Sequence, residues 1–90
     1  MKKRERFDVI NDILVSIKKN KGKIKPTRLL YSSNLSSLMF KDYISDLTKT
    51  GLIAEVKDSK GRKHYEITEK GHDFLRKYSM FNEFVGNLGL

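Results

Sequence analysis

Residues 36–67 read SSLMFKDYISDLTKTGLIAEVKDSKGRKHYEI, and this stretch passes from a helix pattern directly into a hairpin pattern. Ser36 supplies an N-cap oxygen, and apolar side chains at helical spacing then predict a helix that reaches about Thr50. Its inward-facing residues are expected to be Phe40, Tyr43, Ile44 and Leu47. Residues 52–57 and 62–67 have strand patterns, and the turn-forming residues between them predict a hairpin.

The segment before this stretch predicts two more helices. Residues 4–20 carry one apolar helical face, formed by Phe7, Ile10, Ile13, Leu14 and Ile17. Pro26 suits the first turn of a short helix over residues 27–33, since its missing N–H costs nothing there. Asn34 tolerates the left-handed conformation and is expected to end that helix. Residues 23–25 are either an edge strand or a connector.

The segment after the hairpin predicts a fourth helix. Thr68 is placed to cap it, and Gly86 and Gly89 are expected to make its last residues fray. The fold class is therefore mainly α with a small β-hairpin, in the order helix-helix-helix-hairpin-helix of a winged helix-turn-helix. We expect one domain over residues 1–90, with a core and wing in 1–67 and a C-terminal helix in 68–90.

The charge is strongly positive and unevenly distributed. The chain has a formal net charge of +8, and residues 1–25 hold nine basic and three acidic side chains. Residues 67–90 hold three of each. This balance predicts an acidic partner, with nucleic acid first and an anionic membrane second. A charged surface that only aids solubility is the alternative.

Several function classes find no support in the sequence. Cysteine is absent, and the two histidines, His64 and His72, have no visible cluster of metal-binding partners. No Gly-rich phosphate loop or catalytic triad pattern is visible. No apolar run approaches the roughly 20 residues that span a bilayer. We expect a cytoplasmic, nucleoid-associated protein that is not an enzyme, with no cofactor, metal, membrane or small-molecule ligand.

Three short motifs carry a family resemblance: Asn34-Leu35-Ser36, the run over residues 47–53, and Ile67-Thr68-Glu69-Lys70-Gly71. Together they resemble the archaeal winged-helix family of small dimeric chromatin and regulatory proteins, over about residues 6–80. The wing is also similar to that of MarR-type regulators. The resemblance implies DNA as ligand, the third helix as reader, and the wing on the backbone or in the minor groove. Leu38 and Met39 depart from it, because the family usually has polar or basic residues there.

The expected DNA-binding residues fall in the second helix, the third helix and the wing: Arg28, Ser36, Ser37, Leu38, Met39, Lys41, Lys60, Arg62 and Lys63. Alternatives remain open for several of them. Leu38 or Met39 can instead pack against the wing or another chain, and Arg62 can form a local ion pair with Asp58. The basic start of the chain, from Lys2 to Arg6, is either an arm onto the DNA backbone or a frayed terminus.

The fourth helix carries more apolar surface than a thin domain needs. Its expected interface residues are Phe74, Tyr78, Phe81, Phe84 and Val85. An exposed apolar patch of this kind usually marks an interface, so homodimerisation is the prediction. The alternative is that the helix folds back to complete its own core.

Two functions of different classes follow. The first is a homodimeric protein that binds double-stranded DNA, as a transcriptional regulator or a chromatin-type binder. The second is a winged-helix module for protein–protein interaction without DNA binding, because a fold does not fix a function. Charge alone does not separate DNA from RNA.

Overall fold

The fold has four helices and one small sheet. A computed structural model describes residues 3–89, with side chains from residue 5 onward. The elements in chain order are α1 (Lys3–Lys19), β1 (Lys23–Ile24), α2 (Pro26–Ser33), α3 (Ser37–Lys49), β2 (Ile53–Lys57), β3 (Lys63–Ile67) and α4 (Glu69–Asn87). The predicted fold class is confirmed, and the predicted element bounds shift by one or two residues.

The sheet is antiparallel, with strand order β1-β3-β2. The hairpin register pairs Ile53 with Ile67 and Lys57 with Lys63. On the other side of β3, Ile24 pairs with Tyr65. Of residues 23–25, the first two form an edge strand. This strand pairs with the hairpin, and the three strands make one sheet.

The core is built where α1, α2 and α3 meet the sheet. Its buried side chains are Ile10, Ile13, Leu14, Ile17, Ile24, Leu29, Phe40, Tyr43, Ile44, Leu47 and Ile53. The expected inward set of α3 is therefore confirmed. Phe7 differs, since it is 44% exposed and lies at the end of the apolar face of α1.

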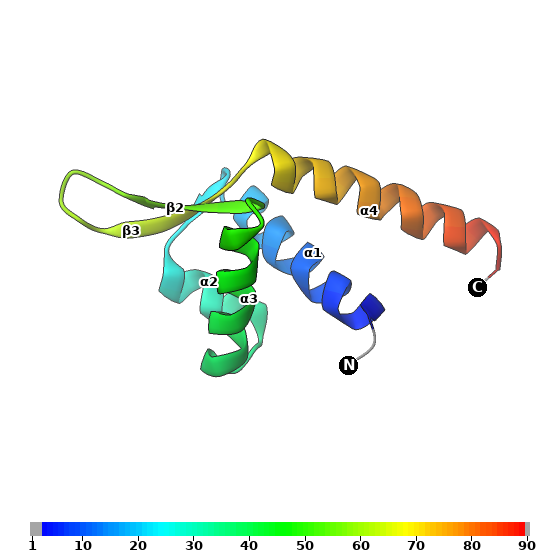
Figure 1. The fold of residues 1–90 in the computed structure, drawn as a ribbon, viewed down its shortest axis with the longest axis horizontal. Coiled ribbons are helices and arrows are strands. Elements are labelled where there is room, and N and C mark those ends of the chain that lie inside the picture. The colour runs from blue at the N-terminus through cyan, green and yellow to red at the C-terminus, as the bar shows by residue number, and fades with distance from the viewer. Residues whose placement is uncertain (1–2, 90) are drawn as a thin grey trace.

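Helix α4 lies outside this core. Gly71 is its one fully buried residue, while Phe74 and Leu75 are half-buried against the core cluster. The helix continues through Gly86 and ends at Asn87, between the two glycines expected to fray its last residues. Figure 1 shows the hairpin projecting at one end of the long axis and α4 extending past α1 at the other. The molecule measures 50 × 26 × 21 Å along its principal axes.

Candidate nucleic-acid interface

The turn between α2 and α3 is fixed by local hydrogen bonds. Asn34 ends α2 in the left-handed conformation, with φ of 57°. The backbone N–H of Leu35 donates to the Ser33 hydroxyl at 3.3 Å. The Ser36 hydroxyl then accepts from the backbone N–H of Met39 at 3.2 Å and caps α3. Both local predictions, the end of α2 and the start of α3, are confirmed.

The start of α3 presents apolar side chains to solvent. Leu38 is 71% exposed and Met39 is 42% exposed, so Leu38 in particular is left largely uncovered by its own chain. Ser37, Lys41 and Asp42 are exposed as well. The inward side of the same helix, by contrast, supplies four residues to the core. One side of α3 is therefore anchored and the other is uncovered.

Helix α2 contributes an exposed arginine. Arg28 lies in its first turn, and its side chain forms no ion pair within the described residues. Lys25, at the N-cap position, makes no capping hydrogen bond through its side chain. No side chain at the N-cap therefore accepts a hydrogen bond from the first N–H groups of α2. These N–H groups and the nearby Arg28 guanidinium could together bind an anion such as a phosphate.

The tip of the wing is held by one carboxylate. Asp58 Oδ1 accepts from the backbone N–H groups of Lys60 at 2.8 Å and Arg62 at 2.9 Å. Its Oδ2 accepts from Arg62 Nε at 2.8 Å. The backbone N–H of Arg62, together with the guanidinium of that residue, lowers the pKa of the Asp58 carboxyl. The predicted Asp58–Arg62 ion pair is present, and the tip is a defined turn.

The wing cations differ in how much charge they leave unpaired. Lys63 Nζ lies 3.0 Å from Glu55 Oε1 on the neighbouring strand, and this partner raises the pKa of Lys63. Arg62 is paired with Asp58 but remains 66% exposed. Lys60 is exposed, and its ammonium makes no ion pair with any described residue. The sequence did not reveal the Lys63–Glu55 pair, because it depends on the hairpin register.

The basic start of the chain is partly tied down. Arg6 pairs with Asp46 of α3, and its guanidinium lies 5.2 Å from the centre of the Tyr43 ring. Arg6 thus joins α1 to α3, which favours a structural role over a free arm. Lys2 lies outside the described residues, as do the side chains of Lys3 and Arg4.

Most of the expected binding residues fall into two groups. One lies at the α2–α3 turn and the start of α3, and the other is the wing tip. Arg28 belongs to neither group, because it lies in the first turn of α2, at the opposite end of that helix from the turn. No hydrogen bond or ion pair among the described side chains links them. Because the C-terminal end of α3 leads into β2, its exposed N-terminal end lies away from the hairpin (Figure 1). The structure therefore offers two separate contact areas.

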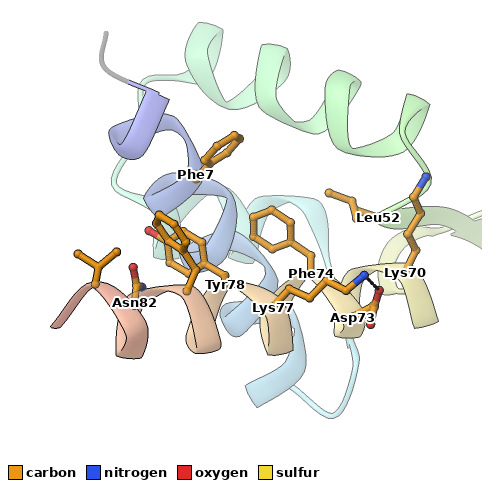
Figure 2. Close-up of a pocket in the computed structure, with 10 residues that line it drawn as sticks. Phe7, Leu52, Lys70, Asp73, Phe74, Lys77, Tyr78 and Asn82 are labelled. Atoms are coloured by element: carbon orange, nitrogen blue, oxygen red, sulfur yellow. Dashed lines mark ion pairs between the residues drawn. The ribbon is translucent and has the colours of Figure 1, made fainter. Parts of the chain in front are cut away.

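A long apolar groove runs along α4 (Figure 2). Its volume is about 770 Å³, and its lining includes Phe7, Leu52, Phe74, Tyr78, Phe81 and Val85. Phe7 meets Phe74 edge-to-face with ring centres 6.4 Å apart. Phe74 stacks on Tyr78 at 5.7 Å. The first half of the helix thus folds back onto its own chain, as the alternative interpretation stated.

The second half of α4 leaves large apolar side chains uncovered. Phe81 is 57% exposed and Phe84 is 61% exposed. Phe84 lies outside the groove lining, whereas the other four expected interface residues line it. Met80 and Leu88, which are not among the expected interface residues, are also exposed. The Tyr78 hydroxyl is buried and has no hydrogen-bond partner in the described part of the chain.

Helix α2 also presents an exposed aromatic side chain that is not among the expected binding residues. Tyr31 on α2 is 77% exposed. The helical spacing of α2 signals this residue only weakly, because the buried Leu29 fixes the inward side and leaves Tyr31 pointing outward.

In the range 3–89, no group of three or more potential metal ligands occurs. Likewise, none of the described helices has the length and apolarity needed to cross a bilayer.

This combination of helices, turn and wing defines a class of protein. The chain belongs to the winged helix-turn-helix family, whose model matches residues 3–85. Among solved structures it is similar to Sso10a-2, a DNA-binding protein from Sulfolobus solfataricus. The two share 28% sequence identity with a TM-score of 0.72, over 91% of this chain and 82% of that one. The expected resemblance to archaeal winged-helix proteins is thereby confirmed. No curated protein sequence matches the chain.

Proposed function

We propose that this chain binds double-stranded DNA, with α3 in the major groove and the wing on the sugar-phosphate backbone or in the minor groove. The observation that carries the proposal is the uncovered side of α3. It lies opposite four core residues, in the helix that a helix-turn-helix inserts into the major groove. The DNA-binding character of the similar Sulfolobus protein supports the same ligand. The proposed role is binding, without catalysis.

Positive charge supports a polyanionic partner. The net charge is +8, and Arg28, Lys41 and Lys60 are exposed cations without a carboxylate partner among the described residues. Such groups bind phosphates at little cost, since no intramolecular pair has to break. Arg62 keeps its ion pair with Asp58 and is still exposed enough to reach a second anion. In this proposal, Ser36 and Ser37 at the start of α3 lie beside the sugar-phosphate backbone of the DNA.

A homodimer through α4 completes the proposal. Residues 1–67 form the DNA-binding part, and residues 68–90 form the dimerisation helix. Phe81 and Phe84 together with the groove along α4 offer an apolar surface of the kind that usually lies at an interface. Two copies present two α3 helices and two wings, which suits a two-fold DNA site. Because the proposed ligand is double-stranded DNA, we expect the protein to lie in the cytoplasm, bound to the nucleoid.

A salt-titrated gel shift on random-sequence duplex tests the proposal. Binding at low salt should weaken roughly thousandfold between 50 and 200 mM salt if a dimer contacts about six phosphates. The variant Arg76→Ala is the control and should bind duplex as the unmodified chain does. Arg76 is paired with Asp73 on α4, outside the proposed DNA-binding residues. Failure to bind at low salt, or binding that salt does not weaken, would contradict the proposal. An RNA duplex of the same sequence separates the two nucleic acids.

The same assay separates a regulator from a chromatin-type binder. A regulator should prefer one site over random duplex by about 10³ or more, whereas a chromatin-type binder should show near-equal affinities.

A protein–protein interaction module is the second candidate. The exposed apolar side chains Tyr31, Leu38 and Met39 favour it, because apolar surface often marks a protein interface. Replacing Leu38 and Met39 by Ser should then abolish binding of the protein partner. If the chain binds DNA instead, the same variant should keep its phosphate-driven binding to duplex nearly unchanged.

A further inference from the structure

The first turn of α3 points to a specific chemical feature of DNA. We propose that Leu38 and Met39 contact the C5-methyl group of thymine in the major groove. The chain would then prefer duplexes that carry this methyl group to duplexes of the same sequence that lack it. This inference rests on the proposed DNA-binding function and names the base feature that α3 recognises.

The first turn of α3 offers apolar contacts and few polar ones. Leu38 is 71% exposed and Met39 is 42% exposed. The Ser36 hydroxyl is already engaged, because it accepts from the Met39 N–H at 3.2 Å. The whole helix, SLMFKDYISDLTK, has no Asn, Gln or Arg. It therefore lacks the Asn or Gln that pairs with adenine and the Arg that pairs most often with guanine, and its two lysines, Lys41 and Lys49, lie beyond the first turn.

The major groove presents one apolar group to such a helix. Each base edge there offers hydrogen-bond donors, acceptors or both, and thymine adds its C5-methyl group. Covering a donor or acceptor with Leu38 would cost free energy, because that group would lose water without gaining a partner. Placing Leu38 against a methyl group removes apolar surface from water on both sides. Thymine is thus the base that complements this turn.

Two charged side chains beside Leu38 favour one orientation of α3 in the major groove. Lys41 and Asp42 follow Leu38 by three and four residues, so they lie beside it on the helix surface. Both are exposed, and neither forms an ion pair within residues 5–89. A phosphate would attract Lys41 and repel Asp42. The helix therefore favours an orientation with Lys41 toward the backbone and Asp42 toward base amino groups, which keeps Leu38 above the base edges.

The test compares duplexes that differ only in this methyl group. Alternating d(A-T) and d(A-U) duplexes of equal length have the same minor groove and the same phosphates. The unmodified chain should bind the thymine duplex at least about fourfold more tightly, which is the effect of burying one methyl group. Alternating duplexes of d(G-C) with and without 5-methylcytosine provide a second pair, and the methylated member should bind more tightly.

Protein variants assign the preference to residues. The double variant Leu38→Ala, Met39→Ala should bind the thymine and uracil duplexes alike. Lys60→Ala is the matched control, since it should weaken binding to both duplexes and keep their ratio. A thermal melt checks that each variant is folded, and the duplex comparison with the unmodified chain needs no variant.

Each outcome has one meaning. Equal affinity for the thymine and uracil duplexes, with salt-dependent binding retained, overturns this inference and leaves the proposed function standing. A preference that survives in the double variant overturns the assignment to Leu38 and Met39. Absence of binding to every duplex at low salt overturns the proposed function and this inference together.

Discussion

Gly71 packs so tightly against Leu52 that a Cβ on Gly71 would overlap the carbonyl oxygen of Leu52 and lie 2.7 Å from Cγ1 of Ile67. The contact fixes the start of α4 on the end of the sheet. Thr68 strengthens it, because its hydroxyl lies 2.6 Å from the carbonyl oxygen of Gly51 and accepts from the Gly71 N–H at 3.1 Å. The direction in which α4 leaves the domain is therefore set by these few atoms.

The variant Gly71→Ala should destabilise the fold by about 1–3 kcal/mol, because the added methyl group has no space between Leu52 and Ile67. Urea unfolding measures the change. The matched control is Gly86→Ala, since nothing lies within 4 Å of a Cβ on Gly86 and this glycine is also inside α4. That control should stabilise the fold by roughly 0.5–1 kcal/mol. A neutral Gly71→Ala variant would show that α4 is not held at this contact.

Features that depend on neighbours in the sequence were predictable. Ser36 and Thr68 cap their helices through the residue three positions later, and Asn34 ends α2 through its own backbone conformation. The inward face of α3 follows from the spacing of its apolar residues, and all four lie in the core. Each of these signals is contained in a few consecutive residues.

Features that depend on distant partners were not predictable. Ile24 becomes part of a strand because β3, some forty residues later, supplies its partner Tyr65. Lys63 reaches Glu55 only in the observed hairpin register. Arg6 meets Asp46 because the fold brings the start of α1 to the side of α3. At the candidate site, Leu38 and Met39 can contact a ligand only if solvent reaches them. The helical spacing of apolar residues does not tell whether these two side chains face solvent or pack against the wing.

The two lysines near the wing tip should affect DNA binding differently. Lys60→Ala should reduce the slope of log K against log salt by about 1 per protomer, since one phosphate contact is lost. Glu55→Gln should instead raise affinity at low salt, because it frees the Lys63 ammonium now 3.0 Å from that carboxylate. Fluorescence anisotropy over a salt series measures both. Unchanged salt slopes in both variants would place the wing away from the phosphates.

Asp58 should make the fold sensitive to acid. Its folded-state pKa lies below the ordinary 3.8, chiefly because the backbone N–H of Arg62 bonds to the carboxylate. A lowered folded pKa stabilises the fold above the unfolded pKa, and this contribution disappears as the pH falls through the folded value. Asp58→Asn should therefore show a smaller loss of melting temperature below about pH 4. Asp42→Asn, at an exposed carboxylate without an ion pair among the described residues, is the control. Identical acid profiles for Asp58→Asn and the unmodified chain would contradict this role.

The exposed end of α4 should decide the oligomeric state. Phe81 and Phe84 are more than half exposed within one chain, so replacing both by Ser removes little packing from the monomer. In the proposed dimer the same rings are buried, and the double variant should sediment as a monomer while keeping its helical circular dichroism. Tyr31→Ser, which removes an even more exposed aromatic ring from α2, should leave the dimer intact. A monomeric double variant should also bind duplex more weakly, because each complex then holds one α3 and one wing. If the unmodified chain sediments as a monomer at micromolar concentration, or the double variant stays dimeric, α4 is not the interface.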